Sequence, residues 1–118
     1  MGREGIDTAD AKQLAAWNPY DQNESAGFFD SKWMFGVEEG FDIVIGNPPY
    51  IQLQADHGKL GDIYKPCGYE TFAKTGDIYC LFYERGWQLL KVNGHLCYIT
   101  SNKWMRAGYG EATRKFFA

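Results

Sequence analysis

The chain has 118 residues, of which 45% are hydrophobic and 17% aromatic, and its formal net charge is −3. This composition indicates one modest globular domain with its own core and excludes a disordered chain. No stretch approaches the roughly 20 apolar residues that span a bilayer, so we expect no membrane association and a cytoplasmic location.

The first 45 residues predict a helix, a long loop and a strand. Residues 8–17 (TADAKQLAAW) are rich in alanine and begin with a capping Thr or Asp, which predicts a short helix. Residues 18–40 mix turn residues with aromatic side chains without any period, so we expect an ordered loop. Residues 41–45 (FDIVI) alternate little between polar and apolar, which predicts a central parallel strand covered on both faces.

Residues 51–76 form the longest segment without a recognisable pattern. An irregular segment of this length is long for a compact domain and is more typical of a functional or mobile loop. Asp77 then caps a predicted helix. The residues on its packed side are spaced as an amphipathic helix requires. The members of that side are Ile78, Leu81, Phe82, Arg85 and Leu89.

The remainder of the chain predicts a return to the sheet. Asn93-Gly94 should end the helix in a left-handed turn, before a strand at 95–100 and a helix at 110–117. Strand, crossover helix and strand make a unit of an open parallel α/β sheet. Two strands do not make a stable sheet, so we expect further strands from the remainder of a longer chain.

The cysteines and histidines give no metal signal. Cys67, Cys80 and Cys97 are an odd number at wide spacing, without a C-x-x-C pair. His57 and His95 have no partner at ligand spacing. We therefore expect neither a disulfide framework nor a bound metal.

Basic side chains gather near the end of the chain. Lys103, Arg106, Arg114 and Lys115 could meet phosphate, but such charges also suit a solvated helix face, which is the better explanation for the charges taken alone. If the protein binds nucleic acid, most of the electrostatic attraction must come from elsewhere.

The segment IGNPPY directly after the first strand carries the clearest chemical pattern. Residues before proline are held extended, so Asn47 and Pro48 should leave the strand in a fixed direction. Pro48 and Pro49 have no N–H, so the segment offers carbonyl acceptors without donors, beside the side-chain oxygen of Asn47. Adjacent acceptors match a planar amine or a carboxamide, and Tyr50 offers a ring on which a base can stack. The plain alternative is that Pro-Pro merely ends an edge strand.

Acceptors suit an aromatic amine that must act as a nucleophile. The lone pair of such an amine is delocalised into its ring, which makes it a poor nucleophile. Hydrogen bonds to both of its protons favour a pyramidal nitrogen and stabilise the positive charge that develops during attack. A sulfonium methyl donor held in line would need no further acid.

The motif and its surroundings resemble a known family. IGNPPY is similar to the [D/N]-P-P-[Y/F] motif of adenine-N6 DNA methyltransferases. The flanking strings resemble the large restriction-modification enzymes of the type IIG kind over nearly the whole chain. These strings are WNPYDQN, FFDSKWMFG, GFDIVIGNPPYIQ, GDIYCLFYERGWQLLKVNGHLCYITSNKWM and GYGEATRKFF.

The resemblance implies a class I, Rossmann-like fold that binds S-adenosyl-L-methionine. Asn47 and Pro48 would bind the N6 amine near the methyl group of the donor. Pro49, the next residue of the motif, would also belong to the catalytic segment. Tyr50 would stack on an adenine flipped out of double-stranded DNA. Asp77 and Tyr79, in GDIY, match the family's next motif beside the active site, although a plain helix cap explains Asp77 equally well.

Several parts of the family pattern are absent. No G-x-G precedes Asn47, and the GYG of residues 108–110 comes too late to hold the cofactor. We therefore interpret residues 1–118 as the central-to-late part of one methyltransferase domain, without its cofactor-binding half or its target-recognition domain. On that interpretation the chain alone should be inactive.

Two other functions stay open. A protein glutamine-N5 methyltransferase of the release-factor type would use the same loop on a carboxamide, which also has two N–H hydrogens. Those enzymes resemble the chain at FDIVIGNPPYI but not in the long aromatic segment after it. The other alternative is a non-catalytic binding or structural remnant.

Overall fold

The computed structural model describes residues 8–18, 20–24 and 27–118. The chain divides into two compact units, residues 1–38 and 39–118. Within the part that the structure describes, none of the helices has the length and apolar character needed to cross a membrane.

The first unit contains the predicted N-terminal helix. α1 (Thr8–Ala16) confirms the helix expected at residues 8–17. Residues 19, 25 and 26 of the expected loop lie outside the described residues. The rest of that segment is turns and extended chain up to residue 30.

A second helix, α2 (Ser31–Phe35), contradicts the prediction that residues 18–40 form a loop throughout. Asp30 caps it, because the Asp30 side chain accepts a hydrogen bond from the N–H of Trp33 at 2.9 Å. Gly36 ends it at φ 70°, in the left-handed region that suits glycine. These signals are local, but the helix is too short to show a period.

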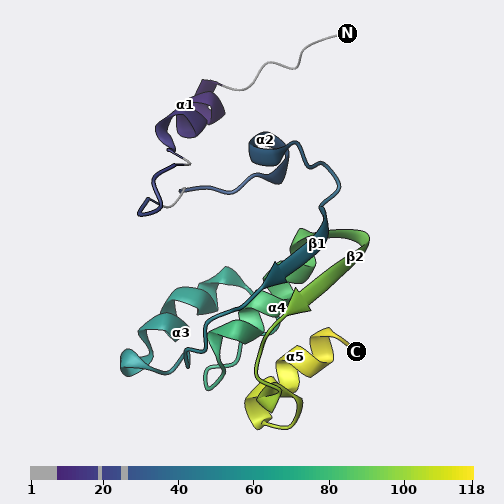
Figure 1. Cartoon of the computed structure of the whole chain (residues 1–118). Coiled ribbons are helices and arrows are strands. Elements are labelled where there is room, and N and C mark those ends of the chain that lie inside the picture. The colour runs from purple at the N-terminus through teal and green to yellow at the C-terminus, as the bar shows by residue number, and fades with distance from the viewer. Residues whose placement is uncertain (1–7, 19, 25–26) are drawn as a thin grey trace. The chain divides into compact units, whose positions relative to one another are not determined.

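The second unit is built on a parallel pair of strands. β1 (Phe41–Gly46) lies beside β2 (Leu90–Tyr98), with Val44 opposite Leu96, and the two arrows point the same way in Figure 1. α4 (Ile78–Leu89) connects the strands. The predicted parallel pairing and crossover helix are confirmed.

The Asn93-Gly94 pair does not end α4, contrary to the prediction. The helix ends at Leu89 and the chain turns directly into β2. Asn93, at φ 64°, lies inside the strand, where the register changes from Phe41 opposite Leu90 to Ile43 opposite His95. The pair therefore lies at an irregularity in the strand pairing, where Asn93 is in the left-handed region.

β1 is not covered on both faces within residues 39–118, which corrects the prediction of a fully covered strand. α4 packs on the sheet where Gly86 lies so close to β2 that a Cβ would meet the Leu96 and Tyr98 side chains. Ile43 and Ile45 remain 61% and 73% exposed. The apolar run of β1 thus lacks a second layer in this unit.

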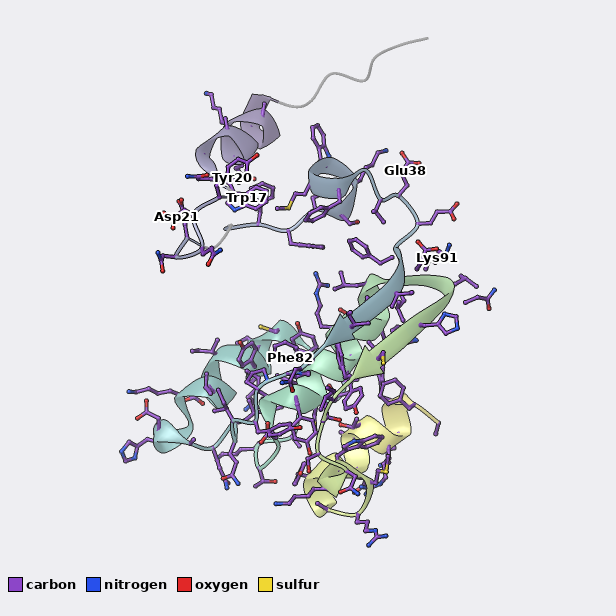
Figure 2. The ribbon with its side chains drawn as sticks, in the orientation of Figure 1. Trp17, Tyr20, Asp21, Glu38, Phe82 and Lys91 are labelled. Atoms are coloured by element: carbon purple, nitrogen blue, oxygen red, sulfur yellow. The ribbon has the colours of Figure 1, made fainter. Side chains whose placement is uncertain are left out.

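The packed side of α4 is rotated from the predicted one. Ile78 and Leu81 are buried as expected, but Phe82 and Arg85 are exposed. Phe82 is labelled in Figure 2. The helix also buries Tyr79, Cys80, Glu84 and Gly86. The reason is that α4 is covered by the sheet and also by residues 51–76.

Residues 51–76 were predicted to be irregular, but they contain helical structure. They contain α3 (Lys59–Tyr64) between two 3-10 turns, η1 (Asp56–Gly58) and η2 (Lys65–Cys67). Their apolar side chains pack with α4 around a small core. That core contains Leu53, Ile78 and Leu81, with Leu60, Tyr64, Tyr69 and Phe72 against it.

A buried carboxylate fastens this segment to α4. Glu84 is 3% exposed. It accepts hydrogen bonds at 2.8 and 2.9 Å from the backbone N–H and the hydroxyl of Thr71. Gln88 donates to its other oxygen at 3.3 Å. The carboxylate is thus satisfied by donors rather than by a cation.

The C-terminal segment returns to pack on α4. After two 3-10 turns, η3 (Lys103–Met105) and η4 (Gly108–Gly110), α5 (Glu111–Phe116) confirms the helix predicted near residues 110–117. The Arg114 guanidinium donates to the carbonyls of Trp104 and Ala107 at 2.6 and 3.0 Å. Arg114 is therefore a structural cation that holds the turn at residues 103–107.

We predict that Gly110→Ala destabilises the fold and that Gly108→Ala does not. A Cβ at Gly110 would overlap the backbone carbonyl of Trp104, whereas a Cβ at Gly108 meets nothing within 4 Å. Because Arg114 holds that carbonyl, relief requires backbone movement, at a cost of about 1–3 kcal/mol. Thermal unfolding of the two variants tests this, and equal unfolding midpoints would contradict it.

Candidate active site

The Asn47–Tyr50 segment begins where β1 ends. The N–H of Ile99, the residue after β2, donates to the Gly46 carbonyl at 3.1 Å. This bond closes the pairing of the two strands at their carboxyl ends. Asn47 therefore leaves the sheet at the edge where the residues after β2 also emerge, the usual position of ligand sites in parallel sheets.

Oxygen acceptors of Asn47 and Pro48 have no hydrogen-bond donor among the described residues. Asn47 and Pro49 are exposed, while Pro48 is buried. Among the described residues, none forms a hydrogen bond with the Asn47 side chain or donates to the carbonyls of Asn47 and Pro48. These oxygens can therefore accept hydrogen bonds from a ligand.

Tyr50 is held in place but keeps part of its ring open. Its hydroxyl donates to the carbonyl of Ile99 at 3.4 Å. Its ring meets the Tyr79 ring edge-on, with centroids 5.6 Å apart and planes at 80°. The side chain is 55% exposed, so ring surface remains available for stacking.

Asp77 links the chain after Tyr50 to the start of α4. Its Oδ1 accepts hydrogen bonds from the N–H of Ile51 at 2.9 Å and from the N–H of Tyr79 at 3.3 Å. The N–H of Ile78 donates to the Ile51 carbonyl at 2.9 Å. Asp77 is thus the predicted helix cap, and the same carboxylate also positions the segment that follows Tyr50.

Tyr79 is joined to the C-terminal turns by its hydroxyl. Tyr79 is 2% exposed, and its hydroxyl lies 2.8 Å from the hydroxyl of Tyr109 in η4. Burial raises the pKa of Tyr79, and the hydrogen bond with Tyr109 raises it further. Tyr79 is therefore neutral at physiological pH, and its hydroxyl makes a structural hydrogen bond between α4 and η4.

A cavity of about 460 Å³ brings together three of the predicted residues: Tyr50, Asp77 and Tyr79. Asn47, Pro48 and Pro49 do not line it. The other lining residues are Gln52, Thr75, Gly76, Ser101, Lys103 and Tyr109. Another cavity, of about 480 Å³ between residues 70–73 and α5, contains none of the predicted residues, so its size gives it no functional weight.

Sequence reasoning missed the wall that the C-terminal segment contributes. Ser101 and Lys103 come shortly after β2, as Asn47 comes after β1. Since the carboxyl ends of parallel strands share one edge, this position was a usable signal. Tyr109 gave no comparable signal, because its contact with Tyr79 depends on how η4 folds back.

Metal-binding groups are not clustered in the part of the chain that the structure describes. No set of three or more His, Cys, Asp or Glu side chains could hold a metal ion there. The thiols of Cys67 and Cys97 are exposed, and burial raises the pKa of the Cys80 thiol.

The family model "Eco57I restriction-modification methylase" matches residues 3–118. The chain is 34% identical over its full length to "Type II methyltransferase M.PaeR7I" of Pseudomonas aeruginosa. It is 38% identical over 81 residues, 66% of the chain, to "Type II restriction enzyme and methyltransferase RM.Eco57I" of Escherichia coli. The chain spans only 19% and 8% of these two relatives.

Two further matches concern possible substrates. "Adenine-specific methyltransferase BrxX" of Escherichia coli is 26% identical over 107 residues, which is 86% of the chain and 8% of that protein. "Release factor glutamine methyltransferase" of Haemophilus influenzae is 33% identical over 60 residues, which is 50% of the chain and 20% of that protein.

Three observations point to the same family. They are the acceptors without a donor after β1, the parallel strand pair, and the match over nearly the whole chain. The expected family is therefore confirmed: the chain belongs to the Eco57I restriction-modification methylase family.

Proposed function

We propose that the chain carries the amine-binding part of a DNA methyltransferase that methylates adenine at N6 within a restriction-modification system. The observation that carries the proposal is a pair of acceptors to which no described residue donates, the exposed side chain of Asn47 and the carbonyl of Pro48, next to the half-exposed ring of Tyr50. An amine with two protons needs two such acceptors, and the ring that bears it needs a stacking surface. The substrate would be double-stranded DNA with the target adenine flipped out.

In this proposal Asn47 and Pro48 each accept a hydrogen bond from one of the two N6 hydrogens. These bonds draw the amine toward a tetrahedral geometry. Tyr50 holds the plane of the base by stacking. S-adenosyl-L-methionine, when bound, would supply an electrophilic methyl group to N6, with release of the neutral thioether and of one N6 proton to solvent. The acceptors stabilise the positive charge on nitrogen during that transfer.

The described residues fit only one end of that cofactor. The oxygens of Asn47 and Pro48, which have no donor among the described residues, suit the positively polarised methyl group of a sulfonium. A glycine-rich turn that would hold the rest of the molecule does not precede β1 in the sequence. We infer that further strands of a class I, Rossmann-like sheet, from the remainder of a longer methyltransferase chain, hold that part.

A glutamine side chain is the second candidate, because a carboxamide also has two N–H hydrogens. The match to the release-factor enzyme favours it but covers half of the chain, whereas the adenine-specific match covers 86%. The aromatic surface of Tyr50 beside the cavity also suits a base better than an aliphatic amide. Methylation of duplex DNA against methylation of a glutamine-containing peptide separates the two.

We predict that Asn47→Ala abolishes methyl transfer in the full-length enzyme while leaving DNA binding largely intact. The loss removes one of two acceptors that act mainly in the transition state, so we expect at least about a hundredfold lower kcat. Asn47→Asp keeps an acceptor and should retain part of the rate. Asn102→Ala, an exposed amide that does not line the cavity, is the matched control. Wild-type turnover by Asn47→Ala would refute the assigned role.

Substitutions at Asp77 distinguish a cap from a direct contact with substrate. Asp77→Asn keeps the oxygen that accepts from Ile51 and Tyr79, so stability and kcat should change little. Asp77→Ala removes it, and we expect a loss of about 1–3 kcal/mol in unfolding free energy. Chemical denaturation and methylation assays on both variants test this. Equal loss of kcat in Asp77→Asn and Asp77→Ala, with stability kept in Asp77→Asn, would instead assign the charge to the reaction.

We also predict that the 118-residue chain by itself neither binds S-adenosyl-L-methionine nor methylates DNA. The residues present hold only the methyl end of the cofactor, and binding energy comes mostly from contacts to its other parts. Isothermal titration calorimetry measures this directly. Micromolar binding by the chain alone would overturn the prediction.

A further inference from the structure

The cavity beside Tyr50 has one negative and one positive side chain in its wall, Asp77 and Lys103. They are not in the same state. The Asp77 carboxylate already accepts two backbone N–H groups. The Lys103 ammonium is exposed and forms no ion pair with a described residue. The wall therefore offers one positive charge without an ion-pair partner among the described residues.

The turn that carries Lys103 is held by contacts of the next residue, Trp104. The Trp104 ring packs on Tyr83 and Phe117, with centroids 5.5 and 6.4 Å away. Arg114 donates to the carbonyl of Trp104 at 2.6 Å. The backbone position of Lys103 is thus fixed by its neighbour, even though its own side chain is in solvent.

Ser101 adds a second polar group to the same wall. Its Oγ accepts a hydrogen bond from the N–H of Lys103 at 3.2 Å. The hydroxyl proton of Ser101 is then free to be donated to a ligand. A hydroxyl and an ammonium side by side suit an anionic oxygen, and a phosphodiester presents two such oxygens.

The other basic residues near the end of the chain do not compete for this role. Arg114 is committed to backbone carbonyls, and Lys115 pairs with Glu111 at 2.8 Å. Arg106 does not line the cavity. Lys103 is the cation that shares a cavity with Tyr50.

We propose that Lys103, assisted by the Ser101 hydroxyl, binds the backbone phosphate of the nucleotide whose base stacks on Tyr50. The inference rests on the proposed function, because it takes the flipped nucleotide as the occupant of the cavity. A cavity of about 460 Å³ has room for the base together with its sugar. The phosphate contact would hold the extruded backbone, and Lys103 would act on binding and flipping rather than on methyl transfer itself.

The test uses the full-length enzyme with Lys103→Gln, Lys103→Arg and the control Lys115→Gln. Lys115 is also an exposed cation of the C-terminal segment, but Glu111 already neutralises it. For Lys103→Gln we expect DNA affinity to fall by up to about fivefold, and the slope of log K against log salt to become shallower by about 0.9. KM for DNA should rise with kcat nearly unchanged, and Lys103→Arg should restore both quantities.

Two further readouts identify the source of the anion. Fluorescence of 2-aminopurine at the target position reports extrusion of the base, and it should fall in Lys103→Gln. Affinity for S-adenosyl-L-methionine should not change, because Lys103 binds the DNA phosphate in this proposal. A lower affinity would assign Lys103 to the cofactor carboxylate and overturn the proposal.

Failure of this proposal and failure of the proposed function give different results. If the unmodified enzyme methylates adenine in DNA but Lys103→Gln keeps the normal salt slope, KM and fluorescence, the phosphate contact is wrong and the function stands. If the unmodified enzyme transfers no methyl group to DNA, the proposed function fails and the inference fails with it.

Discussion

The carboxylate of Asp77 connects the two segments on which the candidate site depends. It accepts one hydrogen bond from Ile51, which follows the acceptor segment, and one from Tyr79 in the first turn of α4. A backbone bond from the N–H of Ile78 to the Ile51 carbonyl adds to it, so the ring contact between Tyr50 and Tyr79 is supported on the Tyr50 side. The geometry at the end of β1 is therefore maintained by a helix cap as much as by the sheet.

From that contact the site extends in layers that differ in rigidity. Tyr79 passes the constraint to Tyr109 through a buried hydroxyl pair, and Arg114 holds the neighbouring turn through two carbonyls. In contrast, the groups that would meet a substrate, Asn47 and Lys103, lie in solvent. Rigid backbone with open side chains is the arrangement that preorganises a site without filling it.

The parts of the fold that were predictable have local causes. A run of apolar residues predicts β1, and an Asp before an apolar helix predicts the cap at Asp77. The parts that were not predictable depend on partners far away in the sequence. Glu84 is buried because Thr71 satisfies it, and a left-handed Asn93 before Gly94 suits an irregularity within a strand as well as a helix end. For the same reason the motif pointed to Tyr50 and Tyr79, while Tyr109 emerged only from the way the C-terminal turns fold back.

The exposed surface of the strand pair has a consequence for biosynthesis. Ile43, Ile45 and Val92 are 61%, 73% and 87% exposed in the chain described here. Open apolar strands recruit other strands, including those of neighbouring molecules. We therefore expect a nascent polypeptide that contains this region to be prone to aggregation until other segments cover these residues.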